Sequence, residues 1–221
     1  MREEHDPTPR IGTAEDAAGP MIVYVVGAGH CGSTLLSLAL DRHPDVFAVS
    51  EIIGLNAKIP GWSKKEEDCR QHAFWSRVAV NYQQAFDEDF WSVPFGALSR
   101  RRGSPVEWAR SNQNALKSVA DTADVSIVVD ASKSPRRLEV LLQETSLDIR
   151  VIYLTRDARA ITHSYDRKYA SLWQGLRKVE RVDRQVRSIK QRYPDAPWLT
   201  LRYEDMSSNL ERSLQQICSF C

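Results

Sequence analysis

The stretch "GAGHCGST", residues 27–34, contains residue types at spacings that could bind a phosphate group. Gly27, Gly32 and Thr34 occupy the glycine and hydroxyl positions of the phosphate-loop pattern GxxxxGK[ST]. Ser33 takes the place of the lysine, which a nucleoside triphosphatase needs to balance phosphate charge. Glycines still allow a tight turn whose backbone N–H groups face an anion, at the start of a helix whose dipole favours negative charge. The loop therefore suits a phosphate-type ligand other than ATP; the alternative is a purely structural turn.

Cations later in the chain could supply the missing positive charge. Arg156 directly follows an apolar run that we expect to be a strand. Ser164 and Lys168 lie one turn apart on a helix that should begin near Asp157. An arginine, a hydroxyl and a lysine that converge suit an isolated phosphate monoester. Lys133 follows another expected strand at the carboxyl edge of the sheet, where open α/β folds bind ligands; the alternative is a solvated loop lysine.

Asp130 supports a competing interpretation. It ends the apolar run "SIVVD", as the aspartate of a Walker B strand does when it serves Mg²⁺. A P-loop kinase or nucleoside triphosphatase would use Asp130 in this way, but such an enzyme would also need a replacement for the missing loop lysine.

Four short apolar runs predict the strands that position these residues. The runs are residues 21–26, 125–130, 149–155 and 198–203. Helical stretches separate the runs, so we expect an α/β fold with a mostly parallel sheet. Ser132 or Ser134 should cap the helix after the second run, with Pro135 in its first turn. The sequence "SNLE", residues 208–211, predicts a capping box that opens the last helix.

Two segments differ from this pattern. Residues 1–20 are charged and rich in Pro and Gly without periodicity, which predicts a disordered N-terminal segment before a domain at 21–221. Residues 58–120 contain four of the six tryptophans and predict a helical insert. Its aromatic residues could pack a helical layer onto the sheet, line an acceptor-substrate pocket, or do both.

Composition narrows the function classes. The 221 residues carry a formal net charge of +1, so no global charge points to nucleic acid or a membrane surface. No run approaches the length of a membrane span, and nothing resembles a signal peptide, so we expect a cytoplasmic protein. The four cysteines and the isolated His72 and His163 do not form a metal-ligand pattern, and no metal is expected.

Four segments in order resemble sulfotransferases that use 3′-phosphoadenosine-5′-phosphosulfate (PAPS), and they are "GAGHCGSTLLSLALDRHPDVFAVSE", "DASKSPRRLEVLL", "IRVIYLTRDARAITHSY" and "LRYEDMSSNLERSLQQICSF". The chain looks similar to bacterial members and, beyond them, to the tyrosylprotein and carbohydrate branch. The resemblance implies a P-loop NTPase-like, mostly parallel sheet flanked by helices, with residues 58–120 as an insert on the acceptor side. It also implies release of 3′-phosphoadenosine-5′-phosphate (PAP) and an acceptor hydroxyl on a small molecule, carbohydrate, lipid or peptide.

The resemblance assigns roles by position. It implies that Glu51 is the base, that Lys133 stabilises the leaving phosphate, and that His30 assists from the loop. The alternative for Glu51 is a helix-capping or loop glutamate. The donor-binding residues that it implies are Gly29, His30, Cys31, Gly32, Ser33, Thr34, Arg156, Ser164, Lys168 and Tyr203.

His30 departs from the family pattern, which has Arg or Lys at this position. Either the activity depends on an imidazolium at His30, or Lys133 supplies most of the charge. Relatives also continue past the last helix with a segment that closes over the nucleotide. A catalytically silent nucleotide-binding relative is therefore the second alternative, and the acceptor and the oligomeric state stay open.

Overall fold

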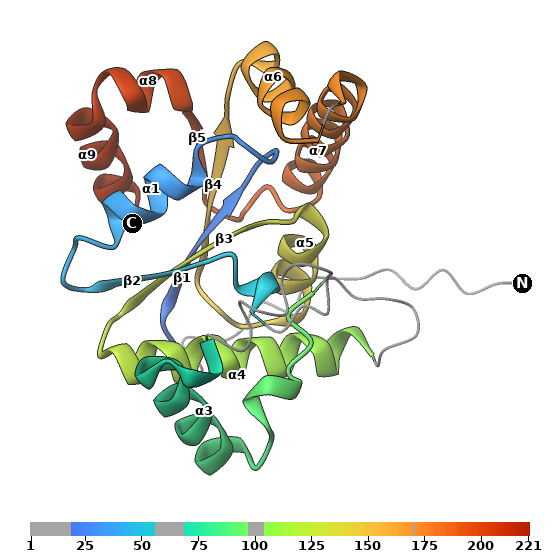
Figure 1. Cartoon of the computed structure of the whole chain (residues 1–221). Helices are drawn as coiled ribbons and strands as arrows, with labels where there is room; N and C mark the ends of the chain where they lie inside the picture. The colour runs from blue at the N-terminus through green and yellow to red at the C-terminus, as the bar shows by residue number, and fades with distance from the viewer. Residues whose placement is uncertain (1–18, 56–68, 97–103, 170) are drawn as a thin grey trace, which may run out of the picture.

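The computed structural model describes residues 19–55, 69–96, 104–169 and 171–221. Five strands form one parallel sheet in the order β2-β3-β1-β4-β5 (Figure 1). The strands are β1 (Met21–Val26), β2 (Val46–Ser50), β3 (Ile127–Lys133), β4 (Ile149–Thr155) and β5 (Trp198–Arg202). The predicted α/β class with a mostly parallel sheet flanked by helices is confirmed.

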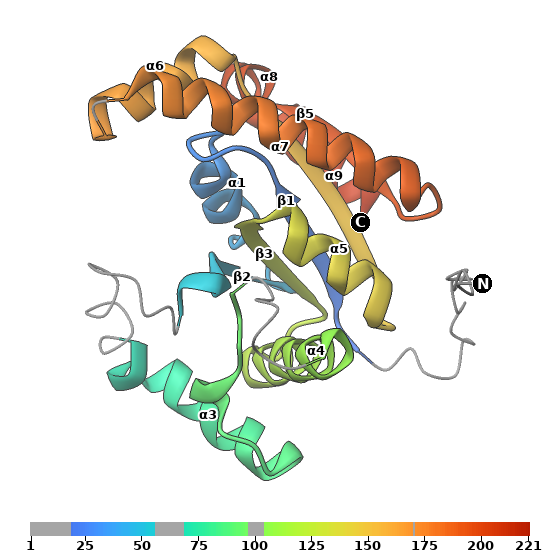
Figure 2. The same cartoon turned by 90° about the vertical axis from the view of Figure 1, so that its right-hand side faces the viewer.

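Helices cover both faces of the sheet, because side chains of the central strand alternate between two cores. The larger core holds Ile22, Tyr24 and Val26 of β1, and the smaller one holds Val23 and Val25. The helices of the larger core are α3 (Ala73–Phe86), α4 (Pro105–Ala123), α5 (Pro135–Glu144) and α7 (Leu172–Arg192). Those of the smaller core are α1 (Ser33–Leu40), α8 (Tyr203–Ser208) and α9 (Leu210–Phe220). α6 (Ala158–Tyr169) packs on α7, as Figures 1 and 2 show.

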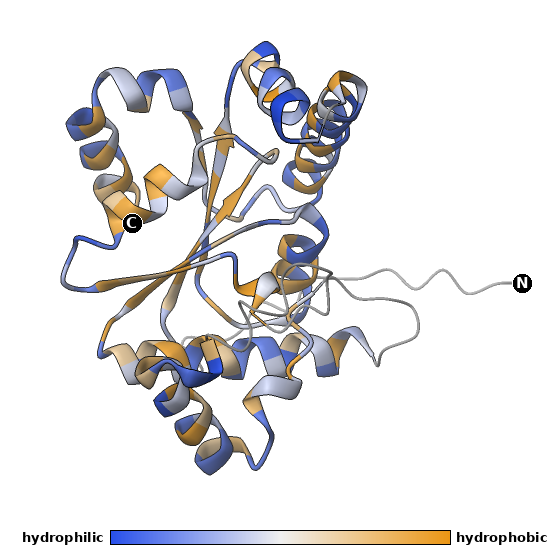
Figure 3. Cartoon of the chain, in the orientation of Figure 1, coloured by the Kyte–Doolittle hydropathy of each residue, from blue (hydrophilic) through white to orange (hydrophobic). Residues whose placement is uncertain are grey.

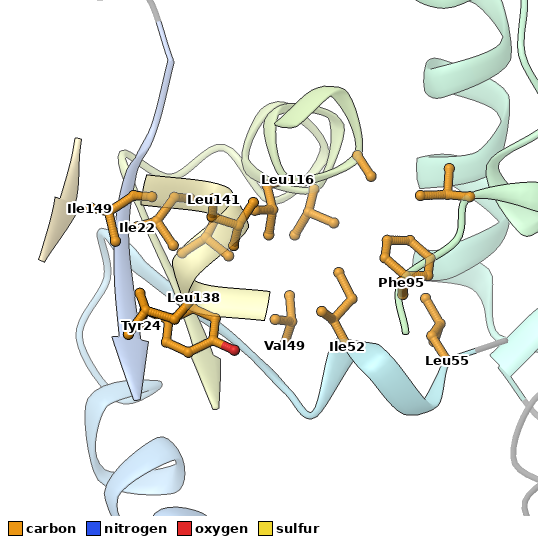
Figure 4. Packing of buried hydrophobic residues seen from close by; sticks show 14 of the residues in the cluster. Ile22, Tyr24, Val49, Ile52, Leu55, Phe95, Leu116, Leu138, Leu141 and Ile149 are labelled. Atoms are coloured by element: carbon orange, nitrogen blue, oxygen red, sulfur yellow. The ribbon is translucent and has the colours of Figure 1, made fainter. Parts of the chain in front are cut away.

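The apolar strands lie between amphipathic helices, and Figure 3 shows their hydrophobic residues gathered in the centre of the molecule. Figure 4 shows the larger core, where Ile22 of β1 meets Leu138 and Leu141 of α5 and Leu116 of α4. This packing holds the strands in a fixed register, so the loops at their carboxyl ends have fixed relative positions.

The structure corrects several predicted boundaries. β2 was not predicted; it is an edge strand of five residues, most of them only half-buried. β3 begins two residues later than predicted and extends to Lys133, so this lysine ends the strand instead of following it. Tyr203 opens α8 and is not part of β5. The capping box at residues 208–211 is wrong, because Asn209 caps α9 and its side chain accepts from the N–H of Arg212.

The caps of α5 follow the prediction. The side chain of Ser134 accepts a hydrogen bond from the N–H of Arg137, and Pro135 occupies the first turn. Ser134, and not Ser132, is therefore the cap.

The helical insert lies between β2 and β3. Its described part comprises α3, the short 3₁₀ helix η2 (Phe90–Ser92) and α4, while residues 56–68 and 97–103 lie outside the described residues. Trp108 is buried, and Trp75 and Trp91 pack against the larger core, so these aromatic residues form a helical layer. The predicted disorder of the N-terminal segment also lies almost entirely outside the described residues. Among the described residues, no helix is long and apolar enough to cross a membrane.

Candidate functional site

The carboxyl ends of all five parallel strands bring the predicted site residues to one edge of the sheet. The glycine loop follows β1, Glu51 follows β2 and Lys133 ends β3. Arg156 follows β4 and Tyr203 follows β5. Open parallel sheets bind ligands at this edge. The sheet therefore supplies one predicted residue or loop from each strand.

Two glycines of the loop lie so close to neighbouring tyrosine side chains that a residue with a Cβ would not fit. Gly32 has φ of 98°, in the region that favours glycine, and a Cβ there would overlap the ring of Tyr203. A Cβ on Gly29 would lie 2.5 Å from the hydroxyl oxygen of Tyr165. Gly32 also precedes the first turn of α1, and it has no side chain that could cap the N–H groups of this turn. The two tyrosines thus enclose a backbone turn of the kind that binds anions.

Arg156 braces the loop. Its Nη1 donates a hydrogen bond of 2.8 Å to the carbonyl oxygen of His30, and its guanidinium carbon lies 4.4 Å from the ring centroid of Tyr203. The ring of His30 meets Tyr165 edge-on at 4.9 Å between centroids. Arg156 therefore connects the end of β4 with the loop after β1.

Lys133 and Glu51 form an ion pair, although 82 residues separate them in the chain. Nζ of Lys133 donates to Oε1 of Glu51 at 2.5 Å. The side chain of Lys133 is 13% exposed and that of Glu51 is 37% exposed, so a ligand can reach the pair from one side. The arrangement places a cation beside a carboxylate at the edge where the anion loop lies.

Backbone conformation sets the site apart from the rest of the described chain. Five described residues other than glycine have positive φ, namely His30, Ser50, Asp87, Asp124 and Lys133. Asp87 and Asp124 end helices, where this conformation is common. The other three are His30, Lys133 and the neighbour of Glu51. Such backbone strain persists only where the surrounding structure enforces it, and it is concentrated at functional sites.

Three cations converge on His30. Burial of the ring lowers the pKa of His30 below its ordinary value of 6.5, and the charges of Lys168 and Arg156 lower it further. Lys133 acts in the same direction, whereas Glu51 opposes the shift. His30 is therefore neutral at pH 7 in the ligand-free protein. Of the two alternatives that the sequence left open, this favours Lys133 as the main source of positive charge.

The remaining predicted site residues differ in how far their side chains are exposed and in which groups they contact. The hydroxyl of Ser164 donates to the carbonyl of Ala160 at 2.9 Å, within α6. Nζ of Lys168 lies 5.3 Å from the ring centroid of Tyr169 on the same helix. Cys31 is 1% exposed and packs in the smaller core, so its thiol is not open to a ligand. Ser33 is buried at the start of α1, and Thr34 beside it is exposed.

Asp130 does not have the setting of a Walker B aspartate. It is fully buried, and both carboxylate oxygens accept hydrogen bonds, from Ser132 and from Arg137. The described residues contain no cluster of three or more His, Cys, Asp or Glu side chains that could hold a metal ion. These internal partners of Asp130 weigh against the kinase interpretation.

Tyr165 is a site residue that sequence reasoning missed. Burial raises the pKa of its hydroxyl, which therefore stays protonated and able to donate beside Gly29. The sequence carried one signal for it, because Tyr165 directly follows Ser164 in a segment already assigned to the site. Only the packing of α6 on the loop distinguishes this tyrosine from Tyr169.

Two surface hollows lie away from this edge. One, of about 410 Å³, includes Met21, Ile127 and Asp148 at the amino-terminal ends of the strands. The other, of about 350 Å³, lies between α3 and α4. No predicted site residue lines either hollow, so the edge at the carboxyl ends of the strands remains the candidate site.

Comparison with known proteins bears on the family and the fold. A family model described as "Sulfotransferase family" matches residues 20–221. Similar solved structures include the sulfotransferase domain of a Synechococcus olefin synthase, at 18% identity and a TM-score of 0.54, covering 93% of this chain and 74% of that one. The sulfotransferase domain from the curacin biosynthetic pathway gives 18% and 0.54, covering 92% and 74%. A Mycobacterium avium sulfotransferase gives 17% and 0.57, covering 93% and 64%. No curated protein matches the chain.

Proposed function

The chain belongs to the sulfotransferase family, and we propose that it transfers a sulfuryl group from PAPS to the hydroxyl group of an acceptor, with release of PAP. The observation that carries this proposal is the contact of Lys133 with Glu51 beside a lysine-free anion loop. The pair combines a cation for a leaving group with a carboxylate for a proton. Both are needed when an oxygen nucleophile displaces a phosphate from sulfur.

The residues present fit the donor. PAPS has a 5′-phosphosulfate and a separate 3′-phosphate, and the site has two sets of groups for them. The loop around Gly32, enclosed by Tyr165 and Tyr203, would hold the 5′ end through backbone N–H groups. Arg156, with Ser164 and Lys168 of α6, would hold the 3′-phosphate. The donor supplies the sulfuryl group and a phosphate as leaving group.

The residues of this chain would divide the work as follows. The acceptor oxygen forms a bond to sulfur while the bond from sulfur to the 5′-phosphate oxygen breaks, and Glu51 accepts the hydroxyl proton. Lys133 stabilises the negative charge that develops on the leaving oxygen. In the ligand-free protein Glu51 holds the ammonium of Lys133, so the donor must compete for that ammonium and thereby release the carboxylate for the acceptor.

The insert is the proposed acceptor side of the domain at residues 21–221. The insert follows Glu51 in the chain, after the 3₁₀ helix η1 (Ile52–Gly54). An acceptor hydroxyl would have to approach Glu51, so the insert lies next to the proposed base in the chain. Its aromatic layer is joined to β3 and α5 by hydrogen bonds of Arg137. An acceptor hydroxyl on a small molecule, carbohydrate, lipid or peptide is compatible with this placement.

The nucleotide preference tests the proposal directly. PAP in the presence of EDTA is expected to raise the melting temperature by about 5–10 °C at roughly 100 times its Kd, since ligand binding stabilises the folded state. ATP with Mg²⁺ is expected to raise it far less. A response to ATP only with Mg²⁺ would support a kinase instead. Binding of PAP without sulfation in a broad acceptor screen would support a catalytically silent relative.

Binding of PAP is expected to be accompanied by proton uptake at His30 as the pH falls below about 7. The pKa of His30 is depressed in the free protein, and bound phosphate must raise it, so binding takes up a proton between the two pKa values. Calorimetry in buffers of different ionisation enthalpy measures this proton uptake. His30→Asn should reduce the uptake, and His163→Asn on the same helix as Ser164 provides the control. Equal uptake by wild type and His30→Asn would contradict the assignment.

A further inference from the structure

Asp130, in the middle of β3, is fully buried although it takes no part in the proposed chemistry. A carboxylate in the interior is unfavourable unless an opposite charge and hydrogen bonds compensate it. Oδ2 accepts from Nε of Arg137 at 3.0 Å, and this arginine is also fully buried. Oδ1 accepts from the N–H and the hydroxyl of Ser132, at 2.9 and 2.5 Å. Both oxygens of this carboxylate thus accept from local partners, and the residue is closed to solvent.

The bonds to Ser132 lie inside a β-bulge. Tyr24 of β1 pairs with Asp130 and Val26 pairs with Lys133, so β3 has one residue more than β1 over this stretch. A bulge bends a strand and redirects the side chain that follows it. The bulge ends at Lys133, whose φ of 61° is unfavourable for a residue with a side chain. The carboxylate of Asp130 therefore closes the turn that gives Lys133 its conformation.

The other side of Lys133 is also anchored. The hydroxyl of Tyr24 donates to the carbonyl of Ser134 at 2.9 Å, and the side chain of Ser134 caps α5. Lys133 therefore lies between Ser132 and Ser134, both of which are held by hydrogen bonds to buried side chains. Asp130 of β3 bonds Ser132, and Tyr24 of β1 bonds Ser134. With this backbone geometry the ammonium of Lys133 donates to Glu51 and to the carbonyl of Ala131.

We propose that Asp130 is a positioning residue, whose Oδ1 maintains the bulge that directs Lys133 toward Glu51. The proposal rests on the proposed function through the role of Lys133. Arg137 serves as the buried counter-ion that allows a carboxylate in this position. Its Nη1 also donates to the carbonyl of Phe95 at 3.0 Å and to Oδ1 of Asn112, so the same arginine connects the bulge with the insert.

Two double variants test the proposal, because removal of one partner alone would leave a buried charge uncompensated. Asp130→Asn with Arg137→Met retains an acceptor at Oδ1 for Ser132. Asp130→Val with Arg137→Met has the same charge and the same change at Arg137 but no acceptor. Both should melt cooperatively and bind PAP with Kd values within about threefold of each other. The valine variant is expected to have a kcat about tenfold or more below that of the asparagine variant, because small displacements of a reacting group are costly.

A second measurement does not depend on activity. Reductive methylation with ¹³C-formaldehyde labels the lysines, and loss of a signal in Lys133→Met assigns that of Lys133. In the asparagine variant this signal should remain as in wild type. In the valine variant it should move to its position in Glu51→Gln, where the ion pair is absent.

The outcomes separate the inference from the proposed function. If wild-type protein sulfates no acceptor, the proposed function fails, and the NMR comparison still decides whether Asp130 positions Lys133. Equal Lys133 signals in the two double variants would overturn the inference, whatever the activity. Tyr82→Phe serves as the control for a buried change in the insert, since it removes the hydrogen bond from Tyr82 to Glu88 and should leave the Lys133 signal unchanged.

Discussion

Replacing Lys133 with methionine is expected to lower kcat for sulfuryl transfer by about 10²–10³-fold, because a preorganised charge at a developing oxyanion contributes a factor of this size. The side chain is 13% exposed and lies at the end of β3, where it is held by Glu51. Methionine retains the apolar stem and removes only the charge. The Kd for PAP should change by no more than about fivefold, since the loop and Arg156 remain. Initial rates with PAPS and single-injection calorimetry with PAP measure the two quantities.

Lys178→Met is the matched control, since this lysine is exposed on α7 and lies outside the predicted site. Glu51→Gln should also lower kcat by about 10²-fold or more through loss of the base. Because Lys133 and Glu51 are in contact, the double variant should lose less activity than the product of the two single losses. Unchanged kcat in Lys133→Met would refute the role of the lysine and with it the division of work between the two residues.

Replacing Gly32 with alanine is expected to weaken PAP binding by about 10²-fold. The φ of 98° at Gly32 costs an alanine about 1–2 kcal/mol, and its Cβ would overlap the ring of Tyr203. Movement of that ring would also disturb Arg156, which stacks on it. The free variant can relieve this strain by a shift of the loop, and PAP must then restore the loop at a cost on the order of 3 kcal/mol; each 1.4 kcal/mol corresponds to a factor of ten in Kd. Titration with PAP measures the change, and the melting temperature should fall as well.

Gly96→Ala provides the control for this substitution. No atom lies within 4 Å of a Cβ at Gly96, so the control should bind PAP as wild type does. Adding Tyr203→Ala to Gly32→Ala should recover part of the lost melting temperature, since it removes the overlap and leaves only the backbone cost. A Gly32→Ala protein with wild-type affinity would show that this part of the loop does not contact the nucleotide.

Local patterns were sufficient for much of the fold. The runs at 21–26 and 149–155 became strands with the predicted bounds, because continuous apolar segments of this length are typical of parallel strands buried on both faces. β2 escaped prediction because an edge strand needs fewer buried residues. The capping box at 208–211 failed because two polar residues in succession, Ser208 and Asn209, could each cap a helix, and α8 already extends to Ser208.

The sequence by itself was sufficient to predict the glycine loop, the parallel α/β class and the residues expected at the strand ends, since each depends on neighbours within a few positions. Only the tertiary structure decided what those residues do together. It brought Lys133 into contact with Glu51, and it gave Asp130 an internal partner in Arg137. It also placed Tyr165 against Gly29 and Tyr203 against Gly32. These contacts join segments distant in the chain or depend on a bulge in β3, and they follow from the strand order and register that the whole core enforces. The loop that lacks a lysine is therefore completed by charges from other strands, and the parallel sheet is the physical reason that they meet there.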